Sequence, residues 1–262
     1  MTNPIDTGNE ERWRSYLNGE DPAPRARRAL WGRLPSPPRC ELCAAPFKGP
    51  FVPLLRLLGR REFAKNPRYC EFCVSSLMAA KGGAEIEMSA LFADVRGSMP
   101  LAERLGPSRT HGVIDRFYTT GVDVLVHGGA MVDRFMGDQI VGYFVPLYAP
   151  AHARSAIETG LALLSATGEG AGGEPWIPIG VGVHTGRSFI GTVGRPGGLL
   201  ELTALGENIN IAARLASVAA AGELLCSEAS YAASGLEHPA ERREVTLKGV
   251  SNPVAVRVLR AN

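Results

Sequence analysis

The spacing of apolar residues changes several times along this 262-residue chain, and each change predicts a new element. Residues 84–95 (AEIEMSALFADV) alternate and then become continuously apolar, which predicts a strand. Residues 108–128 carry an apolar stripe at helical spacing that includes Phe117, so we expect a helix there. A shorter helix should precede it, with Ser98 as its cap and Pro100 in its first turn.

The second half of the chain continues the alternation of strands and helices. Helical spacing returns in residues 150–167 and again in the Ala-rich residues 206–222. Between them, the Gly-rich residues 175–194 predict two strands joined near His184. Residues 243–259 predict a closing pair of strands.

A β-hairpin is expected in residues 131–144, MVDRFMGDQIVGYF, because two apolar runs flank Gly137-Asp138. Strands and helices alternate without strict βαβ order, and further connections have the form of hairpins. We therefore predict an α+β fold, a mixed sheet backed by helices, for residues 84–262.

The chain divides into three parts by composition. Residues 1–38 are rich in Pro, Arg and Gly and predict an irregular lead-in with one helix around residues 10–17. Residues 39–83 hold two cysteine pairs and a linker helix that ends at glycines. Residues 84–262 form a unit of ordinary single-domain size.

Composition and charge narrow the class of protein. Hydrophobic residues make up 45% of the chain, which is typical of a globular protein, and no run of 18 apolar residues predicts a transmembrane segment. The N-terminus is polar and unlike a signal peptide, so we expect a cytoplasmic protein with reduced thiols. The net charge is +2, but residues 1–80 hold 13 Lys and Arg against 8 Asp and Glu. This basic first third could face an anionic partner.

Four cysteines predict a metal site. Cys40 and Cys43 form one Cys-x-x-Cys pair, and Cys70 and Cys73 form a second after 26 intervening residues. Two such pairs are typical of a four-thiolate zinc site, which we favour over an iron–sulfur cluster or a redox dithiol. The fifth cysteine, Cys226, stands alone in a short apolar segment and is most simply a buried apolar residue.

The segment between the cysteine pairs combines an apolar run with basic residues. One interpretation is a docking face for a membrane, a nucleic acid or a partner protein. The interpretation that we favour is a zinc-module core with solvated basic flanks. The six basic residues are Lys48, Arg56, Arg60, Arg61, Lys65 and Arg68.

Two carboxylates occupy positions suited to a metal. Asp94 ends the strand over residues 84–95 and precedes a predicted helix start, where backbone amides attract phosphate. Asp138 lies on the predicted hairpin turn and would approach Asp94 if the strand pairs with the hairpin. Taken singly, a helix cap and a turn former are the simpler interpretations of these two residues.

Three further polar residues could bind a substrate. Asn210 and Arg214 are four residues apart in a predicted helix and therefore share one face. An Arg can grip a phosphoryl group with its planar fork of donors, and Lys248 follows a strand where it could reach a phosphate. Taken alone, an exposed polar helix face is the simpler interpretation of Asn210 and Arg214, and Lys248 could be ordinary surface charge. His184 lies in a Gly-rich setting, and we interpret it as structural.

Five motifs in one order go beyond these local patterns. The series FADVRG, DRFMGDQIVGYF, IGVGVHTGRSFIGTVG, TALGENINIAAR and LKG resembles the class III nucleotidyl cyclase domain, the adenylate and guanylate cyclase family. The resemblance covers roughly residues 86–259. It implies a ferredoxin-like palm, an antiparallel-rich sheet backed by helices, and the conversion of a nucleoside triphosphate to a 3′,5′-cyclic nucleotide and pyrophosphate.

The resemblance also implies a role for each candidate residue. Asp94 and Asp138, with the backbone of Val95, match the ligands of two Mg²⁺ or Mn²⁺ ions. The Gly97, Ser98 and Met99 segment and Lys248 match phosphate-binding positions, although Ser98-Met99 departs from the Phe-Thr common in the family. Asn210 matches the residue that orients the ribose, and Arg214 matches the arginine that stabilises the transition state.

In this family the active site lies between two chains, which implies a homodimer with two equivalent sites. Base recognition falls on Arg134 and Thr203. Thr203 fits the adenine type, so ATP is the favoured substrate. Arg134 replaces the usual Lys, which leaves GTP or a pyrimidine triphosphate open.

Two other hypotheses stay open at the level of sequence. In one, the domain is catalytically silent and belongs to a zinc-dependent protein that binds a nucleic acid or a partner. In the other, the cyclase fold is only a dimerising sensor of nucleotides. The presence of Asp94, Asp138, Asn210 and Arg214 argues against a silent domain.

Overall fold

The computed structural model divides the chain into two compact units. One is Met1–Ile86 with Phe189–Ala204, and the other is Glu87–Ser188 with Leu205–Asn262. The structure describes residues 7–31, 33–34, 38–40, 43–64, 66–79, 81–133, 137–168, 175–194, 200–237, 240–250 and 252–261.

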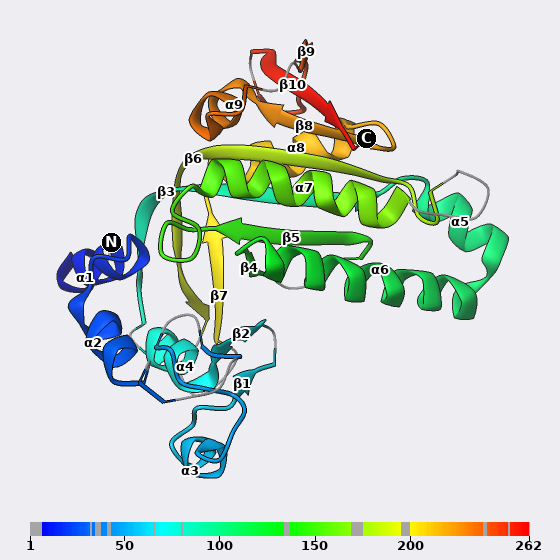
Figure 1. Ribbon diagram of the computed structural model, residues 1–262. Coiled ribbons are helices and arrows are strands. Elements are labelled where there is room, and N and C mark those ends of the chain that lie inside the picture. Colours follow the sequence, from blue (N-terminus) through cyan, green and yellow to red (C-terminus); the bar gives the residue numbers. More distant parts are fainter. Residues whose placement is uncertain are drawn as a thin grey trace. The chain divides into compact units, whose positions relative to one another are not determined.

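The first unit holds the N-terminal helices and the cysteine segment (Figure 1). Its elements are α1 (Thr7–Leu17), α2 (Pro22–Trp31), α3 (Val52–Leu57), β1 (Glu62–Phe63), β2 (Asn66–Cys70), α4 (Glu71–Ala79) and most of β7 (Leu200–Leu205). Helix α1 confirms the predicted N-terminal helix, and its Trp13 and Leu17 share a buried face. The lead-in is not irregular over α2, because Pro22 and Pro24 stand in the first turn, where a helix tolerates proline.

Most of one large sheet belongs to the second unit, while Gly83–Ile86 of its strand β3, Phe189–Gly194 of β6 and most of β7 are counted in the first. The strand order is β4–β5–β3–β6–β8–β10–β9, with β7 paired to β6 off this path. The strands are β3 (Gly83–Val95), β4 (Met131–Val132), β5 (Gln139–Phe144), β6 (Ile179–Gly194), β8 (Glu223–Ser227), β9 (Glu241–Val245) and β10 (Val254–Arg260). Strand β6 pairs with β8 in parallel, whereas β3–β5, β4–β5, β8–β10 and β9–β10 are antiparallel. This antiparallel-rich sheet confirms the predicted α+β class.

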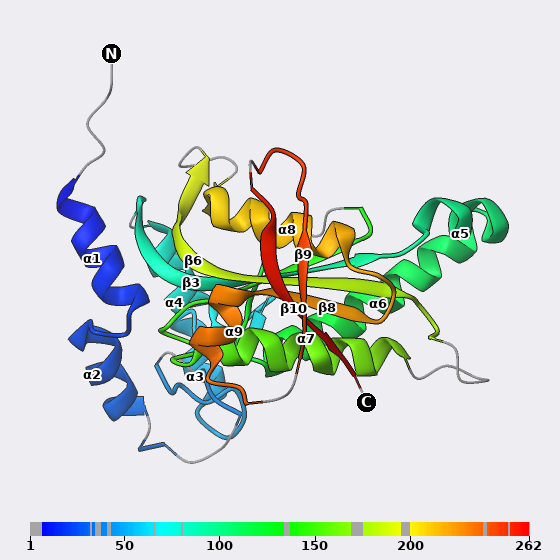
Figure 2. The same cartoon turned by 90° about the horizontal axis from the view of Figure 1, so that it is seen from above.

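Helices cover both faces of this sheet. They are α5 (Ser98–Leu105), α6 (Pro107–His127), α7 (His152–Gly168), α8 (Glu207–Val218) and α9 (Glu228–Ser234). Helices α6 and α7 lie on one face and α8 on the opposite face, as the two views together show (Figures 1 and 2). The main core under α6 and α7 is apolar and includes Leu91, Phe117, Ile140 and Ile157. No helix in the described part of the chain is long and apolar enough to cross a membrane.

Strand β6 replaces the two strands that the Gly-rich pattern predicted. It runs unbroken over 16 residues, with His184 inside it rather than in a connection. At Gly182 the missing side chain lets the backbone of α8 approach the strand, and no turn is formed. A Cβ on Gly182 would lie 2.2 Å from the backbone nitrogen of Ala216, so α8 rests directly on the strand. Val181 faces the other way, into the core beneath α7.

The predicted hairpin and helix start are present with changed details. Strands β4 and β5 pair antiparallel, but only Met131 and Val132 form the first arm, so the connection is longer than two residues. Gly97, with a φ of 67°, occupies the cap position of α5. Ser98 therefore lies in the first turn and makes no side-chain cap, which corrects the prediction for this residue.

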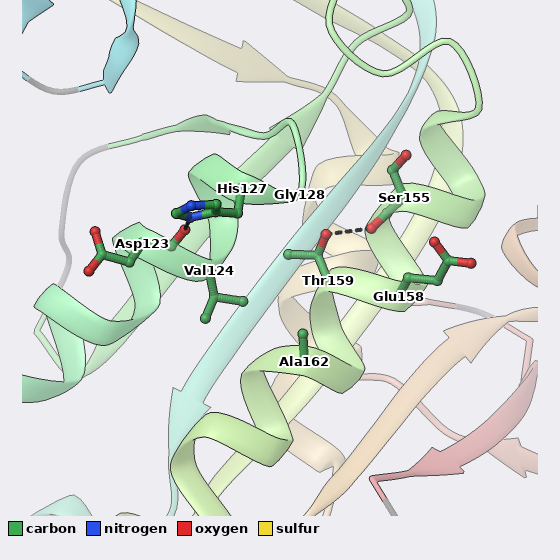
Figure 3. A pocket seen from close by; sticks show the side chains of 8 residues that line it. All are labelled: Asp123, Val124, His127, Gly128, Ser155, Glu158, Thr159 and Ala162. Carbon is green, nitrogen blue, oxygen red and sulfur yellow. Dashed lines mark hydrogen bonds between the residues drawn. The ribbon is translucent and has the colours of Figure 1, made fainter. Parts of the chain in front are cut away.

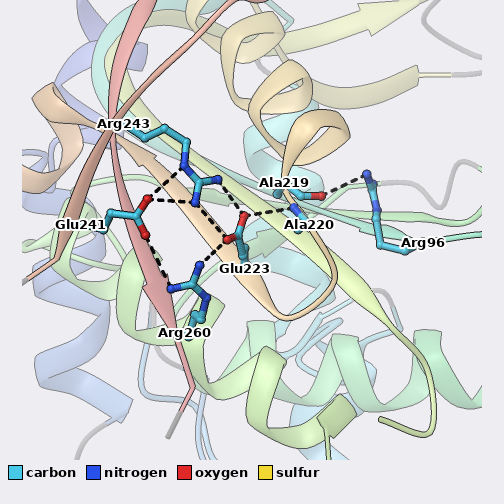
Figure 4. A network of polar contacts seen from close by, with 7 residues as sticks. All are labelled: Arg96, Ala219, Ala220, Glu223, Glu241, Arg243 and Arg260. Carbon is cyan, nitrogen blue, oxygen red and sulfur yellow. Dashed lines mark hydrogen bonds and ion pairs between the residues drawn. The ribbon is translucent and has the colours of Figure 1, made fainter. Parts of the chain in front are cut away.

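A polar network stabilises one end of strands β8, β9 and β10 (Figure 4). The Glu223 carboxylate accepts hydrogen bonds from Arg243 at 3.1 and 3.2 Å and from Arg260, while Glu241 also pairs with both arginines. Burial raises the pKa of Glu223, but the hydrogen bonds from Arg243, the Ala220 amide and Arg260 outweigh it, so the pKa is lowered overall.

Candidate functional site

Strand pairing brings the two candidate carboxylates together. Asp94 lies opposite Gln139 in the β3–β5 register, one residue from Asp138. The Val95 amide donates to the Asp138 carbonyl over 3.2 Å, which joins the end of β3 to the turn. The approach expected from the sequence is therefore present in a single chain.

The electrostatics around Asp94 suit a cation. Asp94 is half-buried, and this burial raises its pKa; Asp138 raises it further, while Arg96 acts in the opposite direction. Within the described part of the chain, the Asp138 side chain makes no hydrogen bond or ion pair. Two neighbouring carboxylates in a partly desolvated position are the oxygen ligands that Mg²⁺ and Mn²⁺ prefer. The residues present therefore fit a divalent metal.

Arg96 is a residue that sequence reasoning missed. Its guanidinium pairs with the Asp94 carboxylate and donates to the Ser217 carbonyl at 2.8 Å. It also donates to the Ala219 carbonyl at 3.4 Å, the contact drawn in Figure 4. Arg96 thus connects the carboxylate site to the C-terminal end of α8. A basic residue two positions after a candidate metal ligand was the available signal.

Tyr118 holds the turn that carries Asp138. Tyr118 lies on α6, and its hydroxyl donates a hydrogen bond to the Gly137 carbonyl. Burial, followed by the Asp138 charge, raises the pKa of Tyr118, so it remains a hydrogen-bond donor. Its local sequence in the predicted helix gave no signal for this role.

The segment after Asp94 forms a compact turn into α5. Gly97 adopts the left-handed backbone conformation, and Ser98 and Met99 begin the helix. The first amides of a helix have no acceptor within it and can bind phosphate oxygens. Met99 is 75% exposed to solvent.

The Arg214 guanidinium lies beside Gly249, the residue after Lys248, although 35 positions separate Arg214 from Gly249 in the sequence. A Cβ on Gly249, which adjoins Lys248, would lie 3.3 Å from Nη2 of Arg214. Asn210 is exposed one turn earlier on α8. Among the described residues, the side chains of Asn210, Arg214 and Lys248 make no hydrogen bond or ion pair with one another or with a neighbour. Their donors are available to an anionic ligand.

His184 has a structural environment. Its Nδ1 is 2.8 Å from the Ser227 hydroxyl, and its Nε2 is 2.9 Å from Oδ1 of Asn208. Burial lowers its pKa, against opposing effects of Asn208 and Glu207. A neutral imidazole that is hydrogen-bonded at both ring nitrogens and joins β6 to α8 agrees with the structural interpretation of His184.

The structure does not test the two candidate residues for base recognition. Thr203 is buried in β7, in the first unit. Arg134 lies outside the described residues. The assignment of both residues to base recognition therefore stays a prediction.

The four cysteines form one buried cluster. The sulfurs of Cys40, Cys43, Cys70 and Cys73 all lie within 4.8 Å of one another, and those of Cys43 and Cys70 are 3.7 Å apart. A tetrahedral zinc site with bonds of about 2.3 Å places its sulfurs about 3.8 Å apart. The cluster therefore fits a single metal ion.

The thiols in this cluster share hydrogen bonds that shift their ionisation. Hydrogen bonding with Cys40 lowers the pKa of Cys43 and lowers that of Cys70 to about 7. Hydrogen bonding with Cys43 and Cys70 raises the pKa of Cys40, and hydrogen bonding with Cys40, Cys43 and Cys70 raises the pKa of Cys73. Thiolates are the form that binds metal.

From the sequence, all six basic residues between the cysteine pairs are expected to be solvated, and the burial of Arg60 corrects this expectation for one of them. Its side chain points into the cysteine cluster, and the residue is only 7% exposed. Arg60 is therefore not part of a basic surface. Arg61 is exposed but pairs with Glu71, and Lys48 and Arg56 remain exposed.

A cleft of about 480 Å³ lies elsewhere in the second unit, between α6 and α7 (Figure 3). Its lining includes Asp123, His127 and Glu158. Nδ1 of His127 lies 2.6 Å from the Asp123 carbonyl, and Glu158 pairs with Arg154. No predicted site residue lines this cleft.

Comparisons with known proteins show which family this chain resembles in sequence and fold. The family profile for the adenylate and guanylate cyclase catalytic domain matches residues 83–257. A curated adenylate cyclase of Anabaena cylindrica is 27% identical over 153 residues, which span 53% of this chain and 30% of that protein. The chain spans about a third of the length of the curated relatives it matches.

Solved structures give the same result for the fold. The guanylyl cyclase Cya2 is 27% identical, with a TM-score of 0.62 over 68% of this chain and 93% of that one. The adenylyl cyclase CyaB from P. aeruginosa shares the fold, at 24% identity and a TM-score of 0.60 over 69% of this chain and 97% of that one.

Proposed function

Because the chain belongs to the adenylate and guanylate cyclase catalytic domain family, we propose that it converts a nucleoside triphosphate to a 3′,5′-cyclic nucleotide and pyrophosphate. In this reaction the ribose 3′-oxygen bonds to the α-phosphorus, the bond from that phosphorus to the bridging oxygen breaks, and the hydroxyl proton is lost. The observation that carries the proposal is the convergence of Asp94 and Asp138 at the β3–β5 edge.

The two carboxylates are proposed to hold a pair of Mg²⁺ or Mn²⁺ ions, with the Val95 backbone as a further ligand. Such ions, when bound, lower the pKa of an attacking hydroxyl and offset charge on the phosphates. Burial is the main cause of the raised pKa of Asp94, and the Asp138 charge adds to it; this supports the assignment because a bound cation offsets both effects. Tyr118 keeps Asp138 in place by holding the Gly137 carbonyl.

The remaining residues are proposed to bind and orient the substrate. Amides of Gly97, Ser98 and Met99 cradle phosphate oxygens at the start of α5. Arg214, whose guanidinium lies beside Gly249, donates to negative charge on the α-phosphoryl group, and Lys248 donates to the terminal phosphates.

Asn210 is proposed to orient the ribose so that its 3′-oxygen lies in line with the leaving group. This residue shares the exposed side of α8 with Arg214, one helical turn away.

We propose that a homodimer assembles the complete site. Arg96 joins Asp94 to the C-terminal end of α8, whereas Asn210 lies in the first turns of that helix. The seven residue-to-residue steps from Asn210 to Ser217 correspond to about 10 Å of helix. A second chain related by two-fold symmetry could present its Asn210 and Arg214 to these carboxylates, giving two equivalent sites.

ATP is the proposed substrate, with Thr203 and Arg134 at the base. The relatives do not decide this point, because their names include both adenylate and guanylate cyclases. GTP and pyrimidine triphosphates are therefore part of the test.

The four-cysteine cluster is proposed to hold one structural zinc ion per chain, and the exposed basic residues around it could contact an anionic or protein partner.

The test is product identification. Purified protein is incubated with Mn²⁺ and each of the four ribonucleoside triphosphates, and products are identified by mass. We expect a cyclic nucleotide from ATP, its loss in Asp94→Ala and Asp138→Ala, and its retention in Asp115→Ala, a control that removes an exposed carboxylate from α6. A folded dimer that cyclises none of the four would overturn the proposal and favour a silent domain.

A further inference from the structure

Arg60 is a buried cation in the first unit. Its residue is 7% exposed, and its guanidinium carbon lies 4.0 Å from the centre of the Phe72 ring and 5.6 Å from that of Trp31. The Arg60 amide donates to the Leu55 carbonyl at 2.8 Å, and the Phe72 amide donates to the Gly59 carbonyl at 2.9 Å. These contacts fix both the backbone and the side chain of Arg60.

The guanidinium is directed at the sulfur cluster. Nη1 of Arg60 lies 3.1 Å from Sγ of Cys43 and 3.9 Å from the sulfurs of both Cys70 and Cys73. The fourth sulfur, on Cys40, accepts the Cys70 amide at 3.2 Å instead. Arg60 therefore covers the face of the tetrahedron that three of the four sulfurs define.

Charge balance requires an anion at this place. An Arg side chain stays protonated in proteins, and a buried cation without a partner is strongly unfavourable. Within the described residues, Arg60 has no carboxylate partner, and the sulfurs are its polar contacts. Neutral thiols or disulfides would leave the guanidinium uncompensated, so the arrangement favours cysteines held as thiolates.

The opposite imbalance arises in a metal site made only of cysteines. Four thiolates around one divalent ion carry a net charge of −2, and this charge is costly to bury. Arg60 reduces it to −1 and supplies an N–H···S hydrogen bond to one ligand. The sulfur spacing of 3.7 Å between Cys43 and Cys70 matches a single tetrahedral ion.

We infer that Arg60 is the charge-balancing and positioning residue of a metal site in which the four cysteine thiolates bind a single zinc ion. This inference rests on the proposed zinc site and adds a fifth residue to it. Arg60 stabilises the thiolate form of Cys43 and orients that ligand, while Phe72 holds the guanidinium in place through a cation–π contact.

The test measures metal affinity on the full chain. Zinc is titrated against a chromophoric chelator for the wild type, Arg60→Met, Arg60→Lys and the control Arg61→Met, which removes the neighbouring exposed arginine that pairs with Glu71. Outer-sphere partners of metal ligands typically contribute 10–100-fold in affinity. We expect a loss in that range for Arg60→Met, a smaller loss for Arg60→Lys, and wild-type affinity for Arg61→Met.

Cobalt provides a readout that a purely structural role would not change. In Co²⁺-loaded protein, the sulfur-to-metal charge-transfer band reports the electron density on the thiolates. We expect this band to shift in both Arg60 variants and to stay unchanged in Arg61→Met. If Arg60→Met does not fold, the affinity and band of Arg60→Lys decide the question.

Wild-type affinity together with an unshifted band in a folded Arg60 variant would overturn the inference. Failure of the underlying zinc site looks different. In that case the wild type itself would take up no stoichiometric Zn²⁺ or Co²⁺, and the inference would fall with it. A wild type that binds one ion while Arg60 variants bind equally well would leave the zinc site intact and reject only the role of Arg60.

Discussion

Gly182 offers a direct test of how β6 positions α8, the helix that carries the proposed substrate-binding residues Asn210 and Arg214. In Gly182→Ala, the new Cβ would lie 2.2 Å from the Ala216 nitrogen and 2.4 Å from the Ala212 carbonyl oxygen. Both are backbone atoms of α8, so no side chain can rotate away. Since ordinary contact begins at 3.4 Å, α8 must move by roughly 1 Å.

That movement should reduce activity more than it reduces stability. Helix α8 carries Asn210 and Arg214, and a misplacement of about 1 Å can lower a rate by about 100-fold. Overpacking of this kind costs about 1–3 kcal/mol of unfolding free energy. We therefore expect kcat to fall 10- to 100-fold, roughly the range such a shift supports, in a protein that remains folded at 25 °C.

The assay pairs cyclic nucleotide production with thermal unfolding. Gly112→Ala is the control, because it lies on α6, has an exposed position and meets nothing within 4 Å. It should keep wild-type kcat and become slightly more stable, by up to about 1 kcal/mol. Wild-type kcat in Gly182→Ala would refute the argument that close packing of α8 on β6 positions the site.

Three further changes test separate parts of the account. Gly249→Ala strains a residue with a φ of 72° and places a methyl group 3.3 Å from Arg214, so kcat should fall while Mn²⁺ dependence stays unchanged. Arg96→Gln removes the cation that pairs with Asp94, so the Mn²⁺ concentration for half-maximal activity should fall; a rise would contradict the assignment of Asp94. Glu223→Gln should lower the unfolding free energy by about 1–3 kcal/mol at pH 7. Because the folded pKa of Glu223 lies below its unfolded value of about 4.3, this difference should shrink as the pH falls below that value, and a constant difference would be inconsistent with the network.

Local patterns predicted how the segments that carry the two candidate carboxylates come together. The Gly137-Asp138 turn and the strand ending at Asp94 both have strong signals in the sequence, and the β3–β5 register brings them together. The four-residue spacing of Asn210 and Arg214 likewise determined their common helix face. These features depend on short-range periodicity, which a single sequence expresses directly.

Features that depend on distant neighbours were predicted poorly. The glycines of β6 resemble a turn signal locally, but close contact with α8 requires them at Gly182. Arg60 resembled a solvated basic residue, although sulfurs 10 to 17 positions away surround its guanidinium. Arg96 was overlooked because its α8 partners are more than 120 positions away. In each case tertiary packing overrides the local preference.

Complementation between two inactive variants tests the central claim most directly. Asp138→Ala lacks a carboxylate and Arg214→Ala lacks the proposed transition-state arginine, so each homodimer should be inactive. Mixed and reassorted in equal amounts, they form heterodimers in about half of the molecules, each with one intact site of two, which predicts about one quarter of wild-type cyclase activity. If the mixture forms heterodimers but stays inactive, the two chains do not share a site and the account is wrong.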